Sequence, residues 1–250
     1  MNFDLFLAPS DADRAARTLS HLSRHDLTRF ALTGGFAIEF HVSALQIQTR
    51  GGQPTLRPLH DIDFLVDSFR DLPPSLGVEL LLRHIHPHDP PAKTLLQGVD
   101  PTTSVRVDVF RAYGNELDRA QPVTLAGISL RIVSLQDLTA RHTRLCWDLV
   151  EGKPLAPKYA RDFLRLLALI PENQFTGSID AIWQEHRKPH FAGAFAEAAQ
   201  QIRRAIEARP DLLIPPSYST DIHEVCERCQ ATPAFPLTPP SQILAHLGYC

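Results

Sequence analysis

The sequence predicts an α+β protein, with a mixed β-sheet flanked by helices and then a helical C-terminal region. Strand and helix patterns are interspersed over roughly the first half of the chain, whereas the second half contains only helix patterns. A chain of 250 residues suits either one large domain or a catalytic domain followed by a helical one. We therefore expect one domain over residues 1–133 and a helical domain over residues 134–250.

Strand patterns are confined to the first half. They are short segments of apolar or alternating residues bounded by glycine, proline and polar turns, at 30–33, 61–66, 81–86, 93–97, 104–110 and 123–133. The last of these contains Gly127 and predicts either another strand or a hairpin around that glycine. The segment 49–58 is rich in glycine and proline, which predicts a loop.

Helix patterns have apolar residues at intervals of three and four, at 12–23, 36–45, 134–150, 159–170, 179–186, 191–208 and 221–229. Ser10 is a suitable N-cap for the first of them. Ser134 is a suitable cap for the helix that opens the second half, with Asp137 in the capping-box position.

Two aspartates lie close together on one predicted strand. Asp61 and Asp63 flank Ile62, and residues two apart on a strand project from the same face. Two adjacent carboxylates repel each other unless a cation lies between them, and Mg²⁺ is the hard cation that prefers oxygen ligands. Asp108, on the strand pattern 104–110, joins them if the two strands pair. Three such aspartates can hold two metal ions for phosphoryl or nucleotidyl transfer.

A glycine turn precedes these carboxylates. Gly34 and Gly35 follow the strand pattern that ends at Thr33 and lead into a helix pattern. Glycine allows close approach of a phosphate, helix N-terminal amides bind anions, and Thr33 adds a hydroxyl group. Taken singly, the two glycines are a simple turn, an isolated Asp-x-Asp is usually solvated charge, and Asp108 is a surface acid on an edge strand. The combination favours a phosphate- and metal-binding site.

These segments resemble a known superfamily. The sequences LTGG from Leu32, DID from Asp61 and VDVF from Val107 are similar to the motifs of the DNA-polymerase-β-like nucleotidyltransferases. Within that superfamily the chain is most similar to the AbiEii-type toxins and related uncharacterised bacterial proteins. The longer segments LTGGFAIEFH and LHDIDFLVD and the later KYARDFLRLL carry that likeness, which covers roughly residues 25–170.

The resemblance implies a nucleotidyltransferase fold and metal-dependent transfer of a nucleoside monophosphate from a nucleoside triphosphate to a hydroxyl or phosphate acceptor. The acceptor class includes RNA, proteins and small molecules. By the same resemblance, Asp61, Asp63 and Asp108 are catalytic and bind two Mg²⁺ ions, with Mn²⁺ as an alternative. The implied nucleotide-binding residues are Thr33, Gly34, Gly35, Arg57, Arg141 and Lys158. The resemblance also implies a toxin role, with an antitoxin protein as partner.

Two departures from the family pattern keep an alternative open. The interval from Gly35 to Asp61 is long, and Arg141 stands where the family usually has lysine. Arginine keeps the positive charge but binds phosphate through a planar fork rather than as a point charge. The alternative is a catalytically weak nucleotide-binding module or subunit with the same fold.

Composition and short motifs limit the possible binding partners and the cellular location. The formal net charge of −3 gives no overall electrostatic case for binding a long nucleic acid. No apolar run reaches the length of a membrane helix and no signal peptide is evident, so we expect a cytoplasmic protein without a membrane partner. His223, Cys226 and Cys229 have zinc-ligand spacing, but a second Cys-x-x-Cys is missing. If this segment is helical the two cysteines share a face, and we favour packing over zinc.

Overall fold

The computed structural model describes residues 3–49, 59, 61–73, 75–76, 81–85, 96–171 and 177–214. Arg57 lies outside the described residues, as do His223, Cys226, Cys229 and the helix predicted at 221–229. Within the described part of the chain, no helix is both long enough and apolar enough to cross a membrane.

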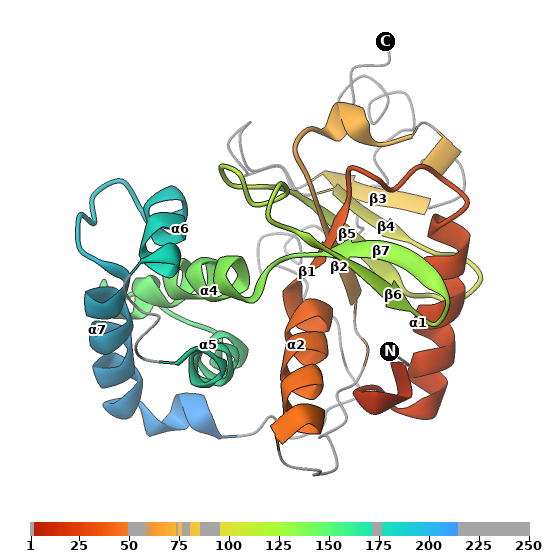
Figure 1. The fold of residues 1–250 in the computed structure, drawn as a ribbon. Helices are drawn as coiled ribbons and strands as arrows, with labels where there is room; N and C mark the ends of the chain where they lie inside the picture. The colour runs from red at the N-terminus through yellow and green to blue at the C-terminus, as the bar shows by residue number, and fades with distance from the viewer. Residues whose placement is uncertain are drawn as a thin grey trace, which may run out of the picture.

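A seven-stranded mixed sheet in the order β3-β4-β5-β2-β1-β7-β6 is the centre of the first half (Figure 1). The strands are β1 (Ala31–Thr33), β2 (Asp61–Val66), β3 (Leu81–Ile85), β4 (Leu96–Val99), β5 (Arg106–Arg111), β6 (Gln121–Leu125) and β7 (Ile128–Ile132). Strand β2 is antiparallel to β1 and parallel to β5. Of the two alternatives for residues 123–133, a strand or a hairpin around Gly127, strands β6 and β7 form the hairpin. Because β5 lies between β4 and β2, it is an inner strand rather than an edge strand.

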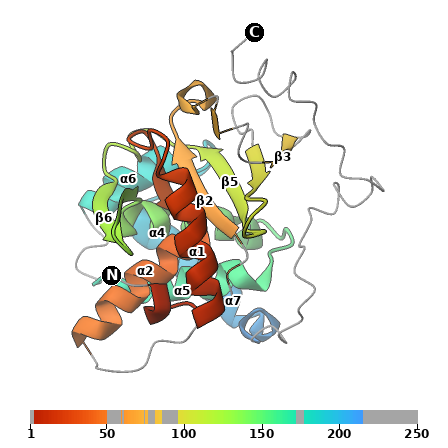
Figure 2. The same cartoon turned by 90° about the vertical axis from the view of Figure 1, so that its right-hand side faces the viewer.

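The helices with described bounds are α1 (Pro9–Leu22), α2 (Gly34–Thr49), α4 (Leu135–Val150), α5 (Pro157–Leu169), α6 (Ser178–His186) and α7 (Phe195–Glu207). Short 3₁₀ segments are η1 (Phe3–Leu5), η2 (Phe69–Asp71) and η4 (Pro210–Leu213). Helices α4 to α7 gather to the left of the sheet in Figure 1, and α1 lies against the opposite side of the molecule. Figure 2, turned by 90°, shows α1 in front of the sheet. The α+β class, a mixed sheet flanked by helices and followed by a helical region, is confirmed.

Local sequence signals explain where two helices begin. Ser134 Oγ accepts a hydrogen bond from the backbone N–H of Asp137 at 3.1 Å, as the capping-box pattern predicts. The prediction for Ser10 was wrong, because α1 begins at Pro9 with Ala8 at the N-cap. Proline suits the first helical position, since its φ is already helical and it has no N–H to satisfy.

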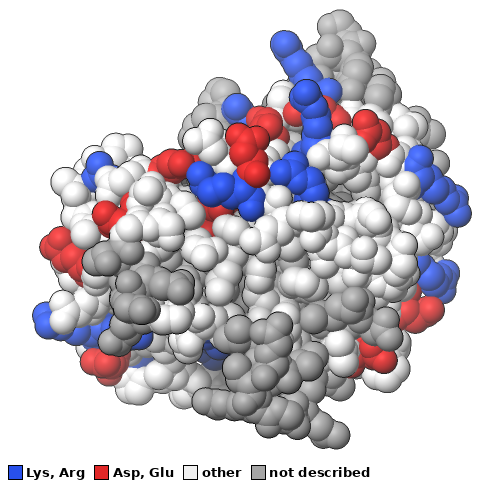
Figure 3. All heavy atoms as spheres, viewed as in Figure 1, with Lys and Arg blue, Asp and Glu red and all other residues white. Residues whose placement is uncertain are grey.

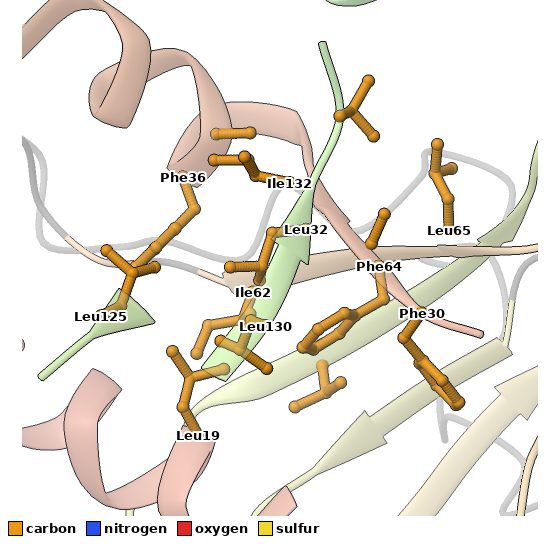
Figure 4. Packing of buried hydrophobic residues seen from close by; sticks show 14 of the residues in the cluster. Leu19, Phe30, Leu32, Phe36, Ile62, Phe64, Leu65, Leu125, Leu130 and Ile132 are labelled. Carbon is orange, nitrogen blue, oxygen red and sulfur yellow. The ribbon is translucent and has the colours of Figure 1, made fainter. Parts of the chain in front are cut away.

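Two clusters of buried apolar residues lie in the described chain. The first joins the sheet to α1 and α2, and the second joins α4, α5, α6 and α7. On β2, alternation directs Ile62 and Phe64 into the first cluster (Figure 4). The ring of Phe64 meets that of Phe30 edge-on, with centroids 5.8 Å apart. The same alternation places Asp61 and Asp63 on the other face of the strand.

A partly buried ion pair ties the helical half to α2. Arg165 of α5 donates to both carboxylate oxygens of Glu39 of α2, at 2.6 and 2.7 Å. The Glu39 side chain is only 3% exposed, so this two-pronged contact fixes α5 against α2 at a defined position. Since α2 begins at Gly34, beside the carboxylates, the ion pair also helps to position α5 relative to them.

Candidate metal centre

The pairing of β2 with β5 brings the three predicted aspartates together. In the parallel register Asp63 lies opposite Asp108, and Asp61 lies opposite Arg106. Because β5 is the direct neighbour of β2, side chains at paired positions project from the same face of the sheet. The condition set by the sequence, that the two strands pair, is therefore met.

The three carboxylates converge. One oxygen from each of Asp61, Asp63 and Asp108 can be chosen so that all three lie within 4.8 Å of one another. Asp108 is buried at 3% exposure, while the Asp61 side chain is 25% exposed and marks the open side of the cluster. Three carboxylate oxygens at this separation are a donor set for a hard divalent cation.

Arg106 is a fourth member of the cluster. Its guanidinium donates a hydrogen bond to Asp61 Oδ2, and its Nε lies 3.2 Å from Asp108 Oδ1. The Nε contact is an ion pair without hydrogen-bond geometry, so this buried N–H has no hydrogen-bond partner in the described structure. Burial lowers the pKa of Arg106, but Asp108, Asp61 and Asp63 together raise it above its ordinary value.

The electrostatics of Asp63 reflect its burial first and the crowding of like charges second. Burial is the largest cause that raises the pKa of Asp63 well above its ordinary range, and repulsion from Asp61 and Asp108 adds to it. Arg106 and Lys158 act in the opposite direction but do not offset the rise. A carboxylate in this state is stabilised as an anion by further positive charge, and a bound divalent cation supplies such charge.

Gly34 lies directly against Asp63. A Cβ atom at residue 34 would be 1.8 Å from Asp63 Oδ2 and 2.9 Å from Asp63 Cβ. Gly34 also has φ of +62°, a conformation that L-residues with side chains rarely adopt. Glycine is therefore required here both by space and by backbone conformation. Gly34 and Gly35 together open α2 at the carboxylate cluster.

Thr33 ends β1 beside these groups. In the antiparallel register it lies opposite Asp63, and its hydroxyl is buried without a hydrogen-bond partner among the described residues. A buried hydroxyl that lacks a partner costs free energy, which a bound polar ligand relieves. This is the observation in the glycine turn that points to a ligand.

The two predicted basic residues on helices have different surroundings. Lys158, in the first turn of α5, is close enough to Asp63 for its charge to lower the pKa of that carboxyl. Arg141 on α4 donates to both oxygens of Glu116, at 3.2 and 2.5 Å, and its guanidinium lies over the ring of Tyr113. Nucleotide contacts for either residue stay predictions, and Arg57 lies outside the described residues.

Sequence reasoning missed Arg106. It lies two residues before Asp108, so the alternation that selected Asp108 also placed Arg106 on the same strand face. That signal was present, but a basic residue was not expected inside a metal-binding cluster. Figure 3 shows basic and acidic side chains next to one another on the face that it draws.

Comparisons with known proteins give limited further information. No family model matches the chain, and no curated protein matches it. Among solved structures, it is similar to an antigenic nucleotidyltransferase-like protein from Paracoccidioides brasiliensis, with TM-score 0.45 and 14% identity over 82% of this chain and 93% of that one. It is also similar to JHP933 from Helicobacter pylori, with TM-score 0.35 and 13% identity over 83% and 95% of the two chains. TM-scores and identities this low support no argument about function. The functional argument therefore rests on the geometry of the site.

Proposed function

We propose that the protein is a metal-dependent nucleotidyltransferase that moves a nucleoside monophosphate from a nucleoside triphosphate to a hydroxyl or phosphate acceptor and releases pyrophosphate. The convergence of Asp61, Asp63 and Asp108 within 4.8 Å is the observation that carries this proposal. The contact of Gly34 with Asp63 supports it, because it places a helix N-terminus for phosphate next to ligands for a cation.

The residues present fit a magnesium site. Three carboxylates offer only oxygen donors, and their mutual repulsion calls for added positive charge. The Thr33 hydroxyl has no hydrogen-bond partner among the described residues. Asp61, Asp63 and Asp108 would hold Mg²⁺ or Mn²⁺. When bound, such ions neutralise the triphosphate and activate the acceptor oxygen for in-line displacement.

The remaining roles belong to the chain itself. The backbone N–H groups at Gly34 and Gly35 bind a phosphate of the triphosphate, and the Thr33 hydroxyl donates to the same group. Lys158 adds positive charge from α5. A carboxylate oxygen of Asp108 accepts the proton of the acceptor hydroxyl, as the family resemblance implies. The helices from residue 134 onward contact the acceptor.

The test is transfer of label from α-labelled nucleoside triphosphates, with Mg²⁺ or Mn²⁺, to total RNA or to protein. We expect labelling by the wild-type chain and at least about a hundredfold loss in the Asp61→Asn, Asp63→Asn double variant. Asp67→Asn is the matched control, since Asp67 is an exposed acid directly after the same strand. Labelling that survives in the double variant would refute the proposal.

A nucleotide-binding module without turnover is the second candidate. The observation that favours it is Arg106, which already supplies a positive charge to the carboxylates. Calorimetric titration with a nucleoside triphosphate and Mg²⁺ separates the two. Binding with no transfer to any acceptor supports the module, and transfer excludes it.

The finer assignment to AbiEii-type toxins stays a prediction from sequence. It is tested by inducing the chain in growing bacteria, with the Asp61→Asn, Asp63→Asn double variant as the control. If the protein is a toxin that acts through this site, induction of the wild-type chain arrests growth and induction of the double variant does not. Equal growth of both cultures would contradict the toxin role and leave the transfer reaction unaffected.

A further inference from the structure

Arg106 is in direct contact with the proposed metal ligands. It contacts two of the three carboxylates that form the proposed metal site, Asp61 by a hydrogen bond and Asp108 by an ion pair. The register of β2 and β5 enforces this position, because Arg106 lies opposite Asp61 and two residues from Asp108 on one strand face.

The charge of the cluster explains the arrangement. Three neighbouring carboxylates with little solvent access are costly as anions without a counter-charge. Arg106 supplies one positive charge in contact with these carboxylates. Lys158 adds a second positive charge near Asp63 from α5. Two positive charges do not fully balance three carboxylates.

The fit of Arg106 to the cluster is also incomplete. Its Nε is buried with no hydrogen-bond partner in the described structure, although an oxygen of Asp108 is 3.2 Å away. A fully bonded guanidinium would use this N–H. The side chain is 31% exposed, so solvent reaches part of it and it can leave the carboxylates without unfolding the strand.

We propose that Arg106 is a built-in counter-ion, which neutralises the carboxylates of the metal-free protein and is displaced from them when a divalent cation binds. This inference depends on the metal site of the proposed function. Its consequence is a lower apparent affinity for the metal, because every binding event must first break the contacts of Arg106 with Asp61 and Asp108. The occupied site then has a mobile positive charge at its open side.

Calorimetric titration with Mn²⁺ alone tests the proposal. It is done at mildly alkaline pH so that protons do not compete for the carboxylates. Arg106→Gln removes the charge and should bind Mn²⁺ about tenfold more tightly, or better, than wild type. Arg106→Lys keeps the charge and should stay near the wild-type affinity. Arg111→Gln is the matched control, because Arg111 is an exposed arginine on the same strand and its loss should change nothing.

The outcomes separate this inference from the proposed function. One outcome is that wild type binds Mn²⁺, that the Asp61→Asn, Asp63→Asn double variant does not, and that Arg106→Gln binds equally or more weakly than wild type. This outcome refutes the counter-ion role of Arg106 and supports the metal site. No Mn²⁺ binding by wild type or by folded Arg106→Gln refutes both. Binding by Arg106→Gln alone supports the counter-ion most strongly.

A measurement on the wild-type protein, in which Arg106 is present, keeps the test valid if Arg106→Gln does not fold. The arginine side-chain N–H signals of wild type are followed by NMR during a Mg²⁺ titration, with the Arg106 signal assigned by its loss in Arg106→Lys. We expect this signal to shift with saturation while that of Arg111 stays in place. An Arg106 signal unchanged at saturating Mg²⁺ overturns the proposal.

Discussion

Replacing Gly34 with alanine should disturb the carboxylate cluster from the backbone side. The new Cβ atom would lie 1.8 Å from Asp63 Oδ2 and 2.9 Å from Asp63 Cβ. A rotation of the carboxylate relieves the first overlap but not the second, because Cβ does not move with the side-chain torsions. The chain must therefore shift β2 relative to the start of α2, which moves a proposed metal ligand.

The expected magnitude has two parts. Alanine at φ of +62° costs about 1–2 kcal/mol of unfolding free energy because of backbone strain alone. Forced overlap with a packed neighbour adds about 1–3 kcal/mol. Displacement of a metal ligand by a fraction of an ångström should weaken Mn²⁺ binding by about 10- to 100-fold.

Gly127→Ala separates the two parts. Gly127 lies in the β6–β7 turn at φ of +82°, and a Cβ there would have no atom within 4 Å. It therefore reports backbone strain without overlap, as a fall in melting temperature of about 2–8 °C and unchanged Mn²⁺ affinity. Gly34→Ala should show a larger fall and weaker Mn²⁺ binding. Equal behaviour of the two variants in thermal unfolding and in Mn²⁺ titration would refute the reasoning.

Two further predictions concern the contacts that join the halves of the molecule. Burial raises the pKa of Asp137, but hydrogen bonds from His186, Arg119 and Ser134 outweigh it and lower the pKa to about 2. The ionised carboxyl therefore adds about 2 kcal/mol above pH 4, and this is lost as the pH falls towards about 2. In urea unfolding, Asp137→Asn should cost at least that much at neutral pH and less in acid, and a pH-independent difference would contradict the assignment. Arg165→Met should cost about 3 kcal/mol because it removes a charged partner of buried Glu39, and adding Glu39→Gln should recover part of the loss. Strictly additive effects would show that the pair is not coupled.

The sequence was most informative where residue pattern and fold depend on the same local geometry. The alternation at Asp61-Ile62-Asp63 predicted both a strand and a shared face for the carboxylates, and β2 has both. The Gly34-Gly35 turn was predicted at the junction of a strand and a helix, and α2 begins there. Turn and alternation signals act over a few residues, so they can be recognised without knowledge of tertiary contacts.

Interactions between distant segments were not predictable in the same way. The pairing of β2 with β5 had to be assumed, because no local sequence pattern identifies which strands are neighbours in the sheet. The Glu39–Arg165 ion pair joins residues 126 positions apart, and neither residue is unusual in its own helix. Arg106 lay within a recognised pattern, but its contact with Asp61 depends on that same strand pairing.

Anomalous diffraction from crystals grown with Mn²⁺ and a non-hydrolysable nucleoside triphosphate tests the central claim most directly. We expect a manganese peak bounded by carboxylate oxygens of Asp61, Asp63 and Asp108, with a phosphate next to the Gly34-Gly35 turn and Arg106 withdrawn from Asp61. Manganese bound elsewhere, or a triphosphate bound with Arg106 still between the carboxylates and no metal among them, would contradict it.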